Sequence, residues 1–352
     1  MARRAVLMSA ALIGWDVGGA HLKAAAVSST GELLRVWSIP CPLWQGLDQL
    51  ESAVSQIEAE LALAQCRHAL TMTGEMCDLF TTRDAGVSGI THWFQRRLGG
   101  APLRVYAADA GLLVCDAVDA RAVASMNWHA TASAVARACP DALLIDVGST
   151  TTDLIRLQAG EIVMAGRDDR SRLASDELVY QGVVRTPVMA LTQRAPYAGV
   201  WQGLAAEYFA TTADVHRLCG TLPDGVDLQP SADGRGKSMA ESAARLARMV
   251  GEDANASNHA HLIALAEHLA GLQRSQLMAA VERVEALRLG TRSMVVGAGI
   301  GRFLARQMAA EQGMTYLDFA AALGLPEALR GVASDHAPAV AVALAGHQHT
   351  WD

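Results

Sequence analysis

The chain has 352 residues, of which 51% are hydrophobic and 18% charged, so it is long enough for two domains and too apolar for general disorder. Its 36 acidic and 29 basic residues give a formal net charge of −7, which argues against a general binder of nucleic acid or anionic membranes. Any anion that the protein binds must therefore be held by a local site.

The first apolar segment follows Arg3-Arg4 and imitates a signal peptide. It continues without a cleavage region into Gly14-Trp15-Asp16-Val17-Gly18-Gly19, which is typical of the first strand of a fold. No other stretch approaches the ~20 apolar residues of a membrane span. The six cysteines are scattered without a C-x-x-C pair, which suits a reducing compartment. The sequence therefore predicts a cytoplasmic protein.

An internal repeat is the most informative pattern in the chain. The tripeptide Asp-Val-Gly begins at Asp16 and again at Asp146, 130 residues apart. Each copy continues through apolar residues to a Gly-Glu turn, at residues 31–32 and 160–161. Each therefore predicts a strand, a turn of small residues, a second strand, a tight turn and a third strand. A duplicated α/β domain follows, which we divide into residues 1–140 and 141–352.

The segments around the two repeats carry further signals. Residues 71–76 resemble a strand end that opens into a polar loop, and residues 223–236 are rich in Pro, Asp and Gly, as excursion loops are. A strand and a glycine turn are predicted at residues 295–301. Apolar periodicity or helix-forming composition predicts helices over residues 47–61, 238–250, 259–289 and 302–312.

The two Asp-Val-Gly turns are predicted to hold a polyphosphate. Glycine lets backbone N–H groups approach phosphate oxygens closely, and small hydroxyl side chains add donors without bulk. Asp16 and Asp146, one from each half, are placed to bind Mg²⁺ directly or through water, and Lys23 adds a point charge. The predicted phosphate-binding residues are Gly18, Gly19, Gly148, Ser149, Thr150 and Thr151.

A third glycine turn consists of Gly297, Gly299 and Gly301 and precedes a helix. A Rossmann dinucleotide site would need an acidic residue about 20 positions later, and Asp318 satisfies that spacing. We interpret Asp318 as lying away from a strand end, and no complete second half follows. The turn is therefore predicted to line a flat pocket of adenosine size.

The segment from Asp233 to Ser238 imitates the end of a Walker A loop. The first glycine of that motif would fall on Ser231, and no strand precedes it, so we reject a P-loop. Two interpretations stay open, a basic loop that closes over an anionic substrate and a solvated linker. Lys23 and Lys237 are the only lysines among the 29 basic residues, either because a compact ammonium is needed or by chance. The candidate substrate-loop residues are Arg172, Ser175, Glu177, Arg185, Arg235 and Lys237.

These motifs resemble those of a known superfamily over nearly the whole chain. The paired Asp-Val-Gly turns and the late glycine turn are similar to the phosphate and adenosine segments of the actin-like ATPase fold. Residues 145–153 resemble the hydantoinase/oxoprolinase group. The strings at residues 14–23, 173–187 and 233–238 resemble a family linked to tetrahydromethanopterin-dependent one-carbon transfer. Archaeal members of that family are the aminomethylfuran-methyl-diphosphate:γ-glutamyltyramine transferases of methanofuran biosynthesis.

The resemblance implies duplicated ribonuclease-H-like domains with an interdomain cleft, and a methylotrophic bacterium that makes a methanofuran analogue. It implies a Mg²⁺-dependent transferase in which a phenolic oxygen, of a tyramine or a tyrosine acceptor, replaces diphosphate on an aminomethylfuran. The implied catalytic residues are Asp16, Lys23, Asp146 and, in a supporting position, Asp153.

Other interpretations stay open. One alternative is an ATP-dependent kinase or oxoprolinase-like amidohydrolase, with a nucleotide at the late glycine turn. Another is a non-catalytic nucleotide sensor or assembly protein. The oligomeric state, monomer or homo-oligomer, is also open.

Overall fold

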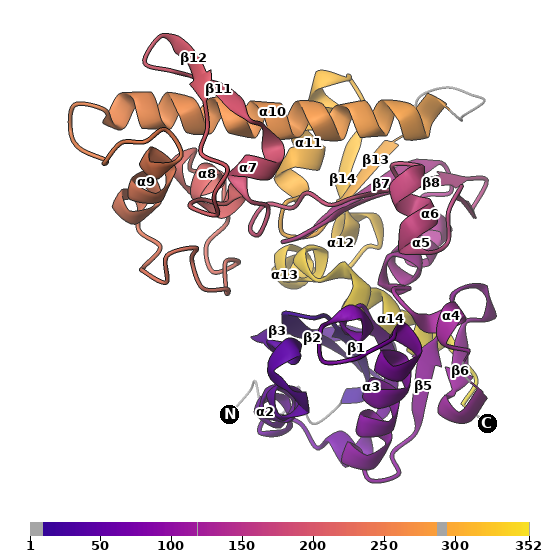
Figure 1. Cartoon of the computed structure of the whole chain (residues 1–352). Helices are drawn as coiled ribbons and strands as arrows, with labels where there is room; N and C mark the ends of the chain where they lie inside the picture. Colours follow the sequence, from indigo (N-terminus) through magenta and orange to yellow (C-terminus); the bar gives the residue numbers. More distant parts are fainter. Residues whose placement is uncertain (1–9, 118, 287–293, 352) are drawn as a thin grey trace. The chain divides into compact units, whose positions relative to one another are not determined.

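The computed structural model describes residues 10–117, 119–286 and 294–351, and the chain divides into two compact units (Figure 1). The first unit comprises Met1–Ala142, Leu157–Val163 and Asp318–Asp352, and the second comprises Leu143–Arg156 and Met164–Leu317. The predicted boundary at residue 140 lies close to the first crossing between the units. Residues 157–163 and 318–352, which the sequence division assigned to the second lobe, pack instead with the first.

The first unit is built on a six-stranded sheet in the order β3-β2-β1-β4-β5-β6. Strands β1, β2 and β3 form the predicted antiparallel repeat, and β4 and β5 continue the sheet in the direction of β1. Alternate residues of β1 enter one core, as the two-residue period of a strand requires. The strands are β1 (Ala10–Val17), β2 (His21–Ser28), β3 (Leu33–Pro40), β4 (Arg67–Met72), β5 (Leu103–Tyr106) and β6 (Leu112–Val114).

The helix α14 (Ala337–Gln348) explains why the C-terminal segment belongs to the first unit. It is rich in Ala and Val and is buried on nearly all its faces, so it needs partners on every side. It packs against β1, β2, β4 and α5. A Cβ added to Gly14 would lie 2.4 Å from the carbonyl oxygen of Ala339 and 2.4 Å from the nitrogen of Ala343. The bare glycine therefore lets the helix rest directly on the strand.

The first unit contains further α-helices besides α14. The predicted amphipathic helix after residue 47 is confirmed as α2. These helices are α2 (Leu47–Glu58), α3 (Arg83–Arg97), α4 (Ala120–Val123), α5 (Asn127–Ala138), α12 (Phe319–Ala322) and α13 (Arg330–Asp335). The structure thus confirms an α/β unit with helices beside its sheet.

A second sheet repeats the plan in the order β10-β8-β7-β13-β14, with β9 paired to β8; most of it belongs to the second unit, while β9 and the last residues of β8 are assigned to the first. The predicted second repeat is confirmed as β7, β8 and β9. Asp318 is the last residue of β14, so the interpretation that it lies away from a strand end was wrong; that strand is only three residues long and shows no alternation. The strands are β7 (Ala142–Val147), β8 (Thr152–Gln158), β9 (Glu161–Val163), β10 (Leu178–Val179), β13 (Met294–Ala298) and β14 (Tyr316–Asp318).

A long helix, α10 (His259–Ala286), runs through the second unit and packs against α7, α8, α9, α11 and a hairpin (Figure 1). The prediction of a helix over residues 259–289 is confirmed as far as 286, and the remainder lies outside the described residues. No helix in the described ranges is long and apolar enough to cross a membrane. The remaining elements are α6 (Asp169–Ala174), α7 (Val188–Leu191), β11 (Arg194–Tyr197), β12 (Val200–Gly203), α8 (Thr212–Leu218), α9 (Met239–Arg248) and α11 (Arg302–Glu311).

Candidate functional site

The first turn carries a buried carboxylate at the end of β1. Asp16 pairs with Lys23 across the β1–β2 hairpin, and the Nζ of Lys23 lies 2.9 Å from Oδ2 of Asp16. The other oxygen, Oδ1, is buried and has no hydrogen-bond partner within the described residues. A buried acceptor of this kind normally has a partner, so its position suits a cation or a water molecule.

Thr71 and Thr73 belong to the predicted strand end at residues 71–76 but were not among the predicted site residues. Thr71 is the register partner of Asp16 on the parallel strand β4, and its Oγ1 is also buried with no hydrogen-bond partner among the residues described. The N–H of Thr73 donates to the carbonyl of Val17 at 2.9 Å. The predicted strand end at residues 71–76 could have indicated that these residues lie near Asp16, because the carboxyl ends of parallel strands meet at one edge of a sheet.

A second buried carboxylate supports the same edge of the first unit. Glu75 lies in a short 3₁₀ turn, Gly74–Met76, and is fully buried. Its Oε1 accepts a hydrogen bond of 2.8 Å from the hydroxyl of Ser125, a non-glycine residue with φ of 56° in the left-handed region. A Cβ on Gly74 would lie 3.1 Å from the carbonyl oxygens of Val17 and Gly18, so this 3₁₀ turn directly contacts the turn that follows β1.

The second turn, residues 148–151, is closed by the N–H of Gly148, which donates to the carbonyl of Thr151 at 2.8 Å. Residues 182–185 lie against it. The N–H of Val183 donates to the carbonyl of Gly148 at 3.1 Å, and the N–H of Arg185 donates to the carbonyl of Ser149 at 2.8 Å. The backbone of Arg185, an exposed predicted substrate residue, is thereby held beside the second turn.

The third glycine turn meets the second turn within the second unit. A Cβ on Gly299, which has a φ of +78°, would lie 2.4 Å from Oδ1 of Asp146. The N–H of Gly301 donates to the carbonyl of Val147 at 2.8 Å. Gly297 instead faces Tyr316, whose hydroxyl would lie 2.2 Å from an added Cβ. The structure therefore brings Gly299 and Gly301 to the second turn and gives Gly297 a packing role.

Three predicted substrate-loop residues contact one another or Asp153. The buried guanidinium of Arg172 donates to Oδ1 of Asp153 at 2.8 Å and to the carbonyl of Glu177 at 3.0 Å. The carboxylate of Glu177 accepts from the hydroxyl of Ser175 at 2.8 Å and from the backbone N–H groups of residues 165–166. These contacts organise the segment that follows β9. Contact of the cluster with substrate stays a prediction.

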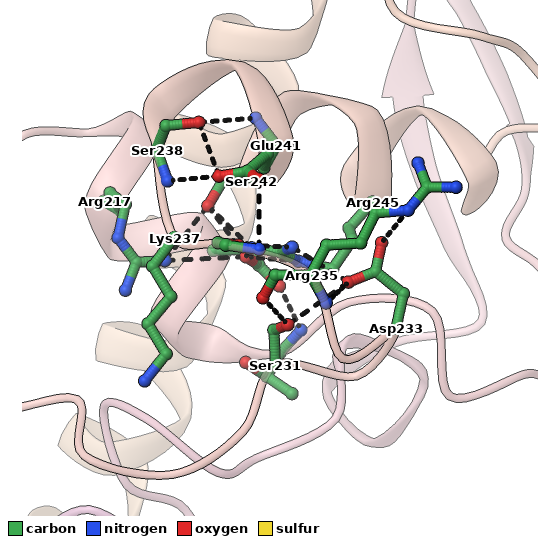
Figure 2. Close-up of polar contacts among 12 residues, drawn as sticks. Arg217, Ser231, Asp233, Arg235, Lys237, Ser238, Glu241, Ser242 and Arg245 are labelled. Atoms are coloured by element: carbon green, nitrogen blue, oxygen red, sulfur yellow. Dashed lines mark hydrogen bonds and ion pairs between the residues drawn. The ribbon is translucent and has the colours of Figure 1, made fainter.

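The loop at residues 231–238 is anchored by a network of ion pairs (Figure 2). Arg245 of α9 is fully buried, and its guanidinium lies 2.7 Å from Oδ1 of Asp214 and 3.1 Å from Oδ1 of Asp233. Nζ of Lys237 lies 3.1 Å from Oδ1 of Asp227. The side chain of Arg235 is 65% exposed on this anchored loop. No strand occurs in residues 219–230, directly before this loop, as the rejection of a P-loop expected. Lys237, the second of the two lysines, is held by its ion pair with Asp227.

Replacing Arg245 by methionine is expected to destabilise the protein by about 3–5 kcal/mol, because two buried or nearly buried carboxylates lose their nearest cation. Thermal or denaturant unfolding measures the change. The matched control is Arg235→Met in the same loop, where an exposed cation contributes less than about 1 kcal/mol. Equal unfolding curves for the two variants would show that the buried pairs do not hold the loop.

Two sheets with the same hairpin repeat, each carrying an Asp-Val-Gly turn, together with a late glycine turn, define an actin-like ATPase fold. A solved acetone carboxylase, determined without nucleotide, matches 95% of this chain and 70% of its own at 12% identity with a TM-score of 0.56, a likeness of fold alone. The chain belongs to the hydantoinase/oxoprolinase family, whose model matches residues 67–335.

Two curated relatives share a more specific name. The (4-{4-[2-(gamma-L-glutamylamino)ethyl]phenoxymethyl}furan-2-yl)methanamine synthase of Methanocaldococcus jannaschii is 31% identical over 265 residues, which are 74% of this chain and 78% of the relative. The synthase of the same name from Methanococcus vannielii is 29% identical over 113 residues, which are 32% of this chain and 50% of the relative. Both names describe a product in which an aryl ether joins a phenol to a furan.

Proposed function

We propose that this protein is an ether-forming transferase that joins an aminomethylfuran-methyl diphosphate to the phenolic oxygen of a glutamyltyramine, tyramine or tyrosine acceptor. The observation that carries the proposal is the 31% identity to the Methanocaldococcus jannaschii synthase over 78% of that relative. The printed name of the relative contains the phenoxymethyl-furan ether that such a reaction makes.

The reaction balances without an oxidant or a nucleotide. The phenolic oxygen forms a bond to the furan methylene carbon, the bond from that carbon to the diphosphate oxygen breaks, and its electron pair leaves with diphosphate. The phenol proton passes to product diphosphate or solvent. Because a phenol has a pKa near 10, full deprotonation before attack at pH 7 would cost about 4 kcal/mol, so late proton loss is favoured. The furan ring stabilises positive charge on the methylene, so bond breaking can lead.

The main demand on the protein is therefore to neutralise charge that grows on the leaving diphosphate. One positive charge about 4 Å away offers about 4 kcal/mol gross at an effective dielectric constant near 20, and only the part gained in the transition state accelerates the reaction. Lys23 beside Asp16 and the backbone of the second turn are the groups we propose for this role. Gly18 and Gly19 in the first unit, and residues 148–151 in the second, are the phosphate-binding residues that we propose.

The carboxylate of Asp16 fits a magnesium ion. Asp16 has one buried oxygen with no hydrogen-bond partner among the described residues, and Mg²⁺ prefers one or two carboxylates completed by substrate phosphate oxygens and water. No group of three or more His, Cys, Asp or Glu side chains suited to a metal occurs in the described part of the chain. We propose a metal-binding role for Asp16 in the first unit and for Asp146 in the second, and a bound ion would supply positive charge to the diphosphate.

A second candidate function is an ATP-dependent reaction of the kinase or oxoprolinase type. The packing of Gly299 against Asp146 supports it, because it brings the glycine turn that we predict to line an adenosine-sized pocket next to the second turn. The two candidates make different products, so one assay separates them.

The test incubates purified protein with the furan diphosphate, Mg²⁺ and either a tyramine-type or a tyrosine-type phenol. We expect diphosphate and ether to appear in equal amounts, measured by coupled diphosphate release and mass spectrometry. Omitting the phenol controls for simple hydrolysis. ATP turnover stimulated by a small substrate, with no ether from any phenol, would overturn the proposal and support the second candidate.

A further inference from the structure

A fully buried glutamine in the middle of α10 contacts the segment behind the second turn. Nε2 of Gln273 donates to the carbonyl of Gly182 at 2.9 Å. Oε1 of Gln273 lies 2.8 Å from Nε2 of His216, which belongs to α8 and is also buried. Both ends of this side-chain amide are thus satisfied inside the second unit, as a buried amide requires.

The direction of these hydrogen bonds is fixed by their chemistry. The oxygen of Gln273 only accepts, so Nε2 of His216 must carry a proton. Burial lowers the pKa of His216 to about 4, so the imidazole is neutral near pH 7, and its Nδ1 faces the hydroxyl of Thr221 at 3.1 Å. The imidazole therefore orients the Gln273 amide so that its N–H points to Gly182.

The carbonyl of Gly182 is held unusually firmly. It accepts from the hydroxyl of Thr212 at 2.8 Å, from Gln273 at 2.9 Å and from the hydroxyl of Thr186 at 3.2 Å. On its other side, Gly182 lies against the Ser149–Thr150 peptide. A Cβ added to Gly182 would lie 2.4–2.5 Å from the atoms of that peptide. Side chains of α8 and α10 therefore fix the position of Gly182. Because Gly182 contacts the second turn directly, they also restrain that turn.

We infer that Gln273, oriented by His216, is a positioning residue that holds the second turn in its phosphate-binding geometry through the carbonyl of Gly182. The inference rests on the phosphate role proposed for residues 148–151. A turn that binds anions through its backbone N–H groups works best when those groups are fixed in advance. Loss of the Gln273 donor would leave the turn with one anchor fewer and the N–H of His216 unpaired.

The experiment measures the Kd of inorganic diphosphate with Mg²⁺ by calorimetry, and separate KM values for the furan diphosphate and the phenol. Gln273→Met is expected to weaken diphosphate binding about 10-fold, the usual scale for loss of a supporting contact, while the KM for the phenol stays unchanged. His216→Leu is expected to weaken it similarly, and His216→Gln, which keeps a donor, to restore most of the affinity. A general structural defect would change both KM values, and would not raise the KM for the furan diphosphate while leaving the KM for the phenol unchanged.

Gln276→Met is the matched control, because Gln276 lies one turn further along α10 and bonds to Gln181 and the Leu191 carbonyl instead of Gly182. Equal diphosphate Kd values for the two glutamine variants, or no diphosphate binding by the wild-type protein, would overturn the inference. If Gln273→Met fails to fold, the two His216 variants decide the question. If the wild-type protein binds diphosphate but makes no ether, the proposed function fails and the Kd ratios still judge the positioning role.

Discussion

Asp146→Asn is expected to lower the rate of ether formation at least about tenfold while leaving the fold intact. Asp146 is the penultimate residue of β7, and a Cβ added to Gly299 would lie 2.4 Å from Oδ1 of Asp146. Asparagine has nearly the same shape, so it fits this space, but it lacks the negative charge that we propose for holding Mg²⁺. Steady-state kinetics over a range of Mg²⁺ concentrations measure the effect, and the thermal transition confirms folding.

The control for this variant is Asp224→Asn, which makes the same chemical change at an exposed position in a loop of the same unit. We expect its rate and its Mg²⁺ dependence to equal those of the wild-type protein. Because the proposed role depends on charge, Asp146→Asn should also require more Mg²⁺ for half-maximal activity. Unchanged turnover and unchanged Mg²⁺ dependence would remove Asp146 from the candidate site.

The parts of the fold predicted from sequence are those in which one local pattern specifies one local structure. The two hairpin repeats were predictable because Asp16 and Asp146 begin the same tripeptide in the same register. The place of α14 was not predictable, because an Ala- and Val-rich helix has no polar face to orient it. Its partner Gly14 lies more than 300 residues away in the chain, and that close contact becomes visible only after folding.

The candidate site shows the same limit. The turns were found from glycine and hydroxyl composition, but Thr71 reaches Asp16 only through the pairing of parallel strands. Gln273 lies in a helical sequence whose pattern gives no sign that its amide reaches Gly182. Arg172 lies in one cluster with Ser175 and Glu177, as their closeness in the sequence suggested. Its guanidinium is nevertheless buried against Asp153, which shows why charge alone does not identify a substrate contact.

Gly182→Ala is expected to have a comparable or larger effect, lowering turnover about 100-fold. The new methyl group would lie 2.4–2.5 Å from the carbonyl carbon and oxygen of Ser149 and the nitrogen of Thr150, which are all backbone atoms. Neither side can yield easily, because three hydrogen bonds hold the Gly182 carbonyl and the turn is closed by its own bond from Gly148 to Thr151. A displacement of about 1 Å in the second turn is enough for such a loss.

The same variant should unfold more easily by about 1–3 kcal/mol, the usual cost of forcing an extra methyl group into a packed interior. Gly271→Ala is the matched control, since, apart from the backbone of its own helix and its chain neighbours, no atom of the described residues lies within 4 Å of a Cβ at that position in α10. Alanine there is expected to be neutral or to stabilise the helix by up to about 1 kcal/mol. Diphosphate affinity and turnover are measured for both variants at a temperature where both are folded. Equal activity of the two variants would mean that displacing the second turn does not matter. It would contradict a role for that turn in binding the diphosphate.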